Sequence, residues 1–202
     1  MEEEKQAVIA AINAKKPEME KWLNRDCWEV WEKKNDCTVY YCDEKDTGFR
    51  SIKSEIVIEK PMKEVYDYIA DISTKTKYDP SFECGRDVEV FDEHYLLQYY
   101  KYKGKLLFSP RDFYVANYRN YGEEASEFFC TNFKSDKYPP IPKIERAELF
   151  YAGFKLTKVE NGNTKVVYYT LGDMHINQTL INLTLKEVAL QIKYMKDILM
   201  KK

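Results

Sequence analysis

The chain has 202 residues, of which 44% are hydrophobic and 33% are charged, and its formal net charge is −2 at pH 7. A domain of this length buries roughly 70% of the surface that its unfolded chain exposes, so it needs no metal or disulfide to fold. The near-neutral charge provides no overall basic field and argues against nucleic acid as a partner. No run of about 18 apolar residues occurs, so no membrane-spanning helix is expected.

The cysteine and histidine patterns contain no metal or redox motif. The five cysteines stand at positions 27, 37, 42, 84 and 130 without a CxxC pair, and the two histidines provide no zinc-finger spacing. We therefore expect reduced, mostly buried thiols, with no metal and no cofactor. The N-terminal stretch MEEEKQAVIAAINAKK is acidic and only briefly apolar, unlike a signal peptide. These features predict a cytoplasmic protein.

The first third of the chain mixes helical and strand patterns. Apolar spacing predicts a helix over residues 2–15, and Pro17 is expected to separate it from a second helix over 18–31. Strands are predicted at TVYYC, residues 38–42, and at RSIKSEIVIEKP, where apolar or small residues alternate with charged ones. Pro61 then stands in the first turn of an expected helix, PMKEVYDYIADIS.

Consecutive strands dominate the rest of the chain until a long terminal helix. The dipeptide Asn161-Gly162 is a strong hairpin signal. From about Gln178 to Met200 apolar residues recur at helical spacing, which predicts one amphipathic helix with an apolar stripe. The predicted strands are 86–91, 94–102, 112–119, 126–133, 145–151, 153–160 and 164–172, and the stripe is Ile181, Leu185, Val188, Ile192, Met195 and Leu199.

This order of elements predicts an α+β protein in which a strongly curved antiparallel sheet wraps around the terminal helix. A helix held by a curved sheet commonly leaves a cavity between the two. We expect residues 1–202 to form one domain, with residues 1–20 as an N-terminal helical arm.

Five segments of the chain have a distinctive pattern: FRSIKSEIVIEKPMKEVYDYIADI, KYDPSF, SPRDF, YPPIPKIERAE and TKVVYYTLGD. The most specific feature is SPRD followed about 35 residues later by RAE. Together the segments resemble the START domain, the lipid-transfer module of steroidogenic acute regulatory protein and its relatives. The resemblance runs from about Trp22 to Leu199, and one family position that usually holds tryptophan is Tyr78 here.

The resemblance implies a helix-grip fold with an internal apolar tunnel for one lipid, closed by the terminal helix and neighbouring loops. In sterol-binding members, the positions matching Gln98 and Asn117 carry an acidic residue and an arginine as a buried ion pair. Two neutral amides can hydrogen-bond a hydroxyl or an ester carbonyl without the desolvation penalty of buried charges. They can equally satisfy each other or a buried water.

The expected cavity residues come from four segments. Lys75 and Tyr78 are candidates for contacts with a phosphate and a quaternary ammonium, although a lysine in such a polar segment is more commonly solvated. Arg111, Asp112, Arg146 and Glu148 are instead expected to form cross-strand charge pairs that fix the register of the sheet. The full set of expected cavity residues is Lys75, Tyr78, Leu96, Gln98, Tyr100, Phe113, Val115, Asn117, Leu185, Val188 and Ile192.

The segment KYKGKLLFSPRDF has loop chemistry but carries three large apolar residues in a row. Gly104 and Pro110 indicate a loop, and Leu106, Leu107 and Phe108 lie between them. We interpret the loop, residues 103–109, as a gate at the mouth of the cavity together with the terminal helix. Its apolar residues would cover the ligand in water and enter a bilayer at a membrane, where Lys103 and Lys105 would meet anionic headgroups. Ordinary core packing is the alternative.

The sequence thus favours a monomeric lipid carrier that contacts membranes transiently. Its partners would be a lipid, with a phospholipid favoured over a sterol, and a membrane surface. The alternatives are a lipid-sensing module and an enzyme of the helix-grip superfamily. His94 and His175 lie in no catalytic motif and no phosphate-binding glycine loop occurs, so nothing in the sequence favours an enzyme.

Replacing Leu106, Leu107 and Phe108 with serine tests the gate. Each apolar side chain lost from a bilayer removes up to roughly 1.5–3 kcal/mol of burial free energy, so transfer between vesicles should collapse while the circular dichroism spectrum stays unchanged. Unchanged transfer by a folded variant would contradict the gate.

Overall fold

The computed structural model describes residues 2–45, 47–105 and 108–201, apart from the side chains of residues 178, 179, 182 and 183. The chain alternates helices with the strands of one large sheet. The helices are α1 (Glu2–Leu23), α2 (Met62–Ala70), α3 (Lys75–Tyr78), α4 (Gln178–Ala189) and α5 (Gln191–Leu199), with 3₁₀ turns η1 (Ile72–Thr74) and η2 (Glu160–Gly162). The strands are β1 (Glu29–Lys34), β2 (Cys37–Asp43), β3 (Arg50–Ile58), β4 (Phe82–Val90), β5 (Tyr95–Tyr102), β6 (Arg111–Asn120), β7 (Ala125–Asn132), β8 (Glu145–Arg146), β9 (Glu148–Lys158) and β10 (Thr164–Asp173).

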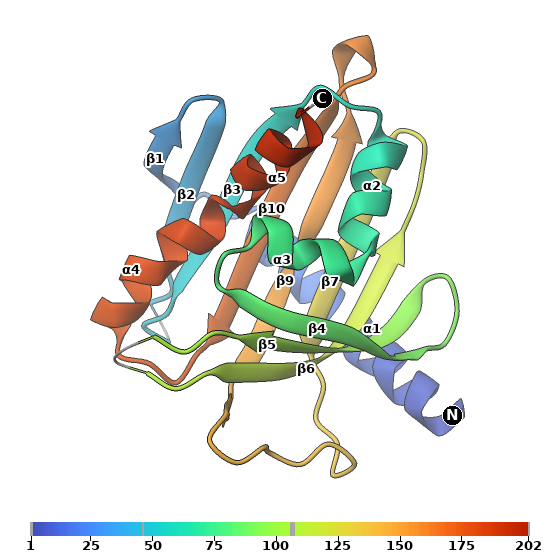
Figure 1. Ribbon diagram of the computed structural model, residues 1–202, viewed down its shortest axis with the longest axis vertical. Coiled ribbons are helices and arrows are strands. Elements are labelled where there is room, and N and C mark those ends of the chain that lie inside the picture. Colours follow the sequence, from blue (N-terminus) through green and yellow to red (C-terminus); the bar gives the residue numbers. More distant parts are fainter. Residues whose placement is uncertain (1, 46, 106–107, 202) are drawn as a thin grey trace.

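The sheet is antiparallel and strongly curved. Its order is β1-β2-β3-β10-β9-β7-β6-β5-β4, and the two-residue β8 adds to β6 in parallel. Figure 1 shows β4, β5 and β6 crossing in front of the lower part of the sheet, while α2, α3, α4 and α5 cover its inner face. This architecture confirms the predicted α+β helix-grip fold.

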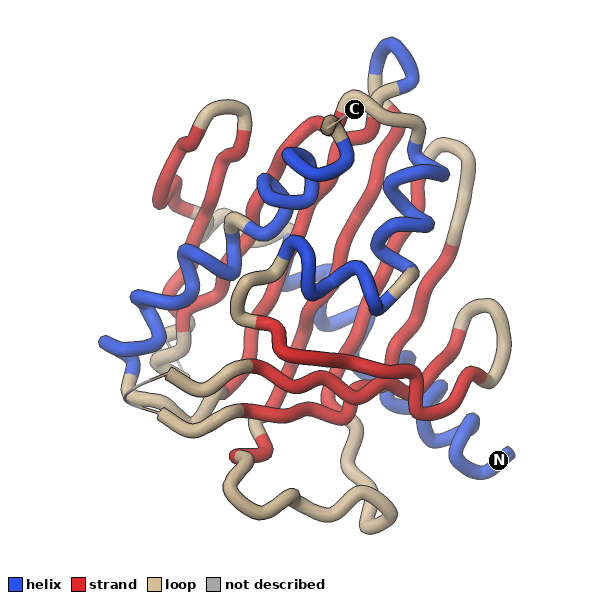
Figure 2. Tube along the Cα trace, viewed as in Figure 1, coloured by secondary structure: helices blue, strands red, loops and turns tan. Residues whose placement is uncertain are grey.

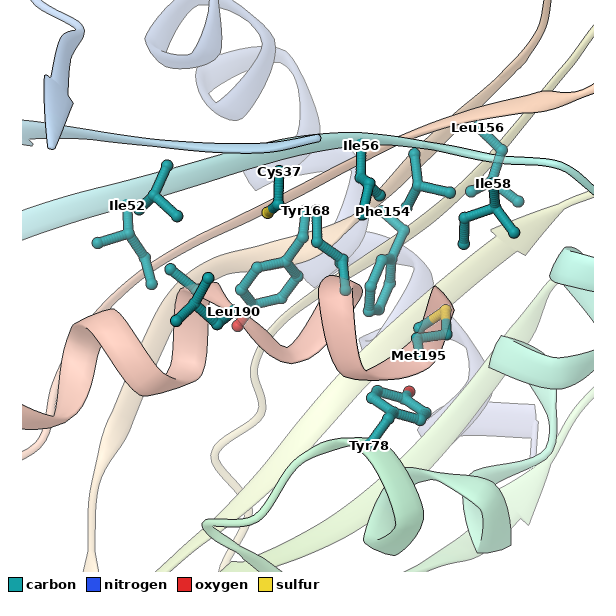
Figure 3. Close-up of a cluster of buried hydrophobic side chains, with 14 of the residues drawn as sticks. Cys37, Ile52, Ile56, Ile58, Tyr78, Phe154, Leu156, Tyr168, Leu190 and Met195 are labelled. Carbon is teal, nitrogen blue, oxygen red and sulfur yellow. The ribbon is translucent and has the colours of Figure 1, made fainter. Parts of the chain in front are cut away.

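The terminal helical region supplies the core that holds the curve. Its apolar stripe packs on β3, β9 and β10, where alternate residues face inward. Figure 3 shows Leu190 and Met195 against Phe154 and Tyr168 of the sheet, with Tyr78 of α3 facing the same helices. The predicted single helix is divided, because the structure places a break at Leu190 between α4 and α5.

Helix α1 packs on the opposite, convex face of the sheet. Val8, Ile12, Met19 and Trp22 are buried there beside Leu97 and Phe129. The predicted interruption at Pro17 is wrong, since one helix runs through that residue. Buried residues on both sides of Pro17 contact the same apolar cluster, and this tertiary packing offsets the local penalty of proline.

Two further element predictions differ from the structure. Residues 29–34 form strand β1 rather than the end of a helix, because Val30 and Glu32 pair with β2 in a hairpin, with an irregularity at Trp31 between them. The expected separate strands 145–151 and 153–160 are the short β8 followed by the continuous β9. Figure 2 shows both the hairpin and the long strand as extended segments.

The expectation that all thiols are reduced is also wrong. Cys27 and Cys42 form a disulfide that joins the segment after α1 to β2, while Cys37 and Cys130 are free and buried and Cys84 is free and exposed. Closing a loop of about 15 residues stabilises a fold by ~3 kcal/mol in the chain-entropy model. The cysteines therefore do not support a reducing compartment.

The SPRD and RAE segments meet in a buried ion pair. Arg146 Nε lies 2.7 Å from Asp112 Oδ1, and Arg146 Nη2 donates to Asp112 Oδ2 at 3.1 Å. The Asp112 side chain is completely buried. This confirms the predicted cross-strand role of Asp112 and Arg146, which ties β8 to β6.

Asp112→Asn should strongly destabilise the protein. It leaves the Arg146 guanidinium without its charged partner, and breaking a buried pair on one side costs ~3–5 kcal/mol. The free energy of unfolding in urea would measure the loss. Glu148→Gln, which removes a partly exposed pair with Lys134, is the control and should cost at most about 1 kcal/mol. Equal effects of the two variants would contradict the structural role of Asp112.

Candidate functional site

A cavity lies between the inner face of the sheet and the helices that cover it. Its volume is about 160 Å³. Its wall is mainly apolar and aromatic. It draws residues from α2, α3, α4 and strands β5, β6, β7, β9 and β10, among them Ile69, Leu96, Phe113, Phe154, Tyr168 and Leu185.

One wall carries a small network of uncharged hydrogen-bonding groups. Asn117 Nδ2 donates to Gln98 Oε1 at 2.7 Å and to the Tyr100 hydroxyl at 3.1 Å. Tyr100 also donates to Gln98, whose Nε2 donates to Asp87 Oδ1 at 2.7 Å. Burial raises the pKa of the Tyr100 hydroxyl well above its usual value, so it remains a donor. The two amides both line the cavity and bond each other.

A charged group forms part of the wall at α3. Lys75 lines the cavity and is only 9% exposed, so the expectation that it is solvated is wrong. Its Nζ lies 3.4 Å from the fully buried Asp79 and donates to Gln191 Oε1 of α5 at 3.3 Å. The rings of Tyr78 and Phe82 lie 5.5 and 5.3 Å from the ammonium. The carboxylate of Asp79 offsets the free-energy cost of burying the Lys75 ammonium group.

At the mouth of the cavity, Arg111, the first residue of β6, contacts two loops. Its guanidinium donates to the carbonyl groups of Ser109, Met174 and His175 and to the Ser109 hydroxyl. Burial lowers the pKa of the Arg111 guanidinium. The hydrogen bonds connect the 103–110 loop to the segment that leads into α4.

The same loop also contacts α4 and the cavity. Phe108 lines the cavity and lies under the guanidinium of Arg111, 5.4 Å from it. Lys105 Nζ lies 3.2 Å from Glu187 of α4, and both side chains are more than 40% exposed. Lys105 pairs with Phe108 in a short β-bridge that shapes the loop. Thus the loop and α4 are held together at the mouth.

Most predicted cavity residues border the cavity in the structure. They are Lys75, Tyr78, Leu96, Gln98, Tyr100, Phe113, Asn117, Leu185 and Val188. Val115 and Ile192 do not border it and are completely buried in the core. Of the predicted gate, Lys103, Lys105 and Phe108 border the cavity, whereas Leu106 and Leu107 lie outside the described residues.

Sequence reasoning missed several wall residues. Arg111 and Arg119 both line the cavity, and the alternation of β6 places them on the face of Phe113 and Asn117. Following the same face two residues beyond Phe113 and two residues beyond Asn117 would have identified both arginines. Cys130 and Met174 also line the cavity, but no local signal marks them, because the curvature of the sheet decides which strands face inward.

The fold and site can now be compared with known proteins. The family model for the START domain matches residues 2–191. The chain belongs to the START domain family. No curated protein sequence matches the chain.

Solved START structures share the fold at low sequence identity. Human StAR-related lipid transfer protein 5 aligns with a TM-score of 0.81 at 14% identity, over 92% of each chain. Human STARD10 aligns at 0.79 and 16% identity, over 91% of this chain and 77% of its own. A STAR-related lipid transfer protein from Xanthomonas axonopodis aligns at 0.71 and 16% identity, over 87% and 100%.

The START family and these relatives indicate a lipid-binding module, which is the coarse function the sequence predicted. Among the described residues, no group of acidic, histidine or cysteine side chains could hold a metal ion. Within the same residues, no helix is both long and apolar enough to cross a membrane.

Cys130 offers a direct chemical test of the cavity. Burial raises the pKa of its thiol to about 12, and thiolate is the reactive form. Alkylation by a lipid-soluble maleimide should therefore be slow at pH 7 and rise about tenfold per pH unit. Bound lipid should block it, because Cys130 lines the cavity.

Cys37 serves as the internal control for that experiment. Burial raises the pKa of its thiol to about 11, and it lies in the core away from the cavity. Peptide mapping in a Cys84→Ser background, which removes the exposed thiol, would compare the two sites. Equal protection of Cys37 and Cys130 by lipid would contradict the assignment of the cavity as the ligand site.

Proposed function

We propose that the protein binds one lipid in the cavity and transfers it between membranes. The observation that carries the proposal is the mainly apolar cavity enclosed between α4 and the curved sheet, in a chain of the START family. Burying acyl or ring carbons there contributes about 0.8 kcal/mol per CH₂ group. In this proposal the protein acts as a monomer with transient contact to membranes.

The gate consists of the 103–110 loop and α4. Phe108 and Leu185 border the cavity from these two elements, so moving either one exposes the interior. The ion pair between Lys105 and Glu187 is largely solvated, and such pairs contribute at most about 1 kcal/mol. The break at Leu190 between α4 and α5 is the hinge that we assign to α4. The gate opens when the loop enters a bilayer.

A phospholipid fits the wall better than a sterol. Lys75 places an ammonium group in the wall, where it can approach a phosphate. Tyr78 adds an aromatic face that can meet a quaternary ammonium. Gln98 and Asn117 replace a charged pair with amides, which suits the ester carbonyls of acyl chains.

Incubation with mixed-lipid vesicles, re-isolation and mass spectrometry of the bound lipid test the proposal. We expect one phospholipid per protein, and transfer of a labelled phospholipid from donor to acceptor vesicles. Leu185→Trp, which fills the cavity from α4, should abolish binding. Val57→Trp, at an exposed position on β3, is the matched control. A folded protein that holds no lipid under all conditions would refute the proposal.

A sensing module is the second candidate. Helix α4, which is part of the gate, contacts the β1–β2 hairpin through Lys186. The Nζ of Lys186 lies 3.8 Å from Glu32 and 5.1 Å from the Trp31 ring. A change in ligand occupancy would alter this outer surface. Lipid binding without any vesicle-to-vesicle transfer would favour sensing.

A further inference from the structure

The charged residues of the cavity wall all have the same sign. Lys75, Lys103, Lys105, Arg111 and Arg119 line the cavity, and no aspartate or glutamate does so among the residues that the structure describes. The whole chain has a formal net charge of −2. The cationic wall is therefore a local feature that the overall composition does not produce.

These cations differ in how they are neutralised. Lys75 has the buried carboxylate of Asp79 at 3.4 Å. Arg111 is only 7% exposed and has no carboxylate within ion-pair distance among the described residues. Its hydrogen bonds go to neutral oxygens. Glu145, its partner on β8, attracts the guanidinium only from beyond ion-pair distance. A buried cation whose counter-charge is distant is costly, so the guanidinium of Arg111 is the group in the wall that gains most from an anion.

Arg111 also keeps hydrogen-bonding capacity. A guanidinium carries five N–H groups. Nε donates to Met174 O at 3.0 Å, Nη1 donates to the two oxygens of Ser109, and Nη2 donates to His175 O at 3.2 Å. The second N–H of Nη2 has no acceptor within the part of the chain that the structure describes.

Lys103 and Lys105 lie beside Arg111. Strands β5 and β6 pair Tyr102 with Arg111, so the two lysines follow directly at the same end of the strands. Their present partners are the carbonyl of Pro80 at 2.8 Å and Glu187 at 3.2 Å, both at exposed positions. Exposed lysine contacts of this kind are weak, and both side chains can turn toward an anion at little cost. We call Lys103, Lys105 and Arg111 the mouth cluster.

We propose that the ligand is a lipid of net negative charge whose phosphate or carboxylate group binds the mouth cluster while its chains extend along β6 toward Arg119. This inference rests on the proposed function and specifies its substrate class. Arg111 and Arg119 are eight residues apart on one strand face, or ~27 Å at 3.3–3.4 Å per residue. One leaflet of a bilayer has a hydrocarbon depth of about 15 Å, so the distance between the two residues along β6 exceeds the length of an extended acyl chain in a leaflet.

The test is competition between lipids for the full chain. Vesicles contain equal amounts of cholesterol, phosphatidylcholine, phosphatidylserine, phosphatidic acid and oleic acid, and native mass spectrometry reads the bound lipid at 50 and 500 mM NaCl. We expect the net-negative lipids to be enriched at least tenfold over phosphatidylcholine at low salt, with the enrichment reduced at high salt by screening at the exposed lysines.

Variants locate the effect at the mouth cluster. Lys103→Gln and Lys105→Gln should each reduce the enrichment about fivefold, corresponding to about 1 kcal/mol per lysine. Lys101→Gln is the control, because Lys101 of β5 pairs with Glu83 of the neighbouring β4 and does not line the cavity. Arg111→Gln should abolish the enrichment. If that variant does not fold, the two exposed lysines still decide the question.

The outcomes separate the two proposals. One bound phosphatidylcholine or cholesterol per protein, without enrichment of anionic lipids, would overturn the anionic class and leave lipid binding intact. Protein that binds no lipid at all would overturn both. Stabilisation of the protein by inorganic phosphate alone, measured as a thermal shift, would assign the mouth cluster to a free anion and also overturn the inference.

Discussion

The packing of the terminal helices on the inner face of the sheet is the constraint on which the rest of the structure depends. Ile192 and Met195 of α5 are completely buried against β3, β9 and β10, and that contact fixes how far the sheet must curve. Helix α4 precedes α5 in the chain and lies over the part of the sheet that borders the cavity. The curved strands there cannot all reach the helix, so the cavity remains between them.

The charges of the protein follow this division into a packed end and an open end. At the packed end, Lys196 of α5 contacts Asp36, Glu59 and the carbonyl of Val57, which anchors α5 to the β2 and β3 region. At the open end, Arg111 has only neutral acceptors. Lys196 therefore has carboxylate partners where the structure is closed, whereas Arg111, where a ligand would enter, has none within ion-pair distance in the described part of the chain.

Much of the fold was predictable because it depends on periodic patterns. The alternation in β3 and the stripe from Ile181 to Leu199 each specify which face is buried, and consecutive strands with short turns specify an antiparallel sheet. The errors lie where tertiary packing overrides a local signal. Pro17 continues in a helix because both halves of α1 pack on one surface, and Val30 and Glu32 join a strand because β2 is available to pair with them.

The site was predictable only in part, for a related reason. Positions on β5 and β6 followed from alternation, so Gln98 and Asn117 were found together with Phe113. The disulfide between Cys27 and Cys42, the exclusion of Val115 from the cavity wall and the burial of Lys75 depend on distances between segments far apart in the chain. No spacing rule within one segment contains that information.

The location of the chain ends has a practical consequence for how the molecule can be attached to other things. The N-terminus leaves from α1 on the convex face and the C-terminus leaves from α5, whereas the 103–110 loop meets the start of α4 at a third place, on the left in Figure 1. A sensor surface, a fluorescent protein or another folded unit joined at either end would leave the mouth uncovered. The protein can therefore be tethered by either end while its cavity stays accessible from solution.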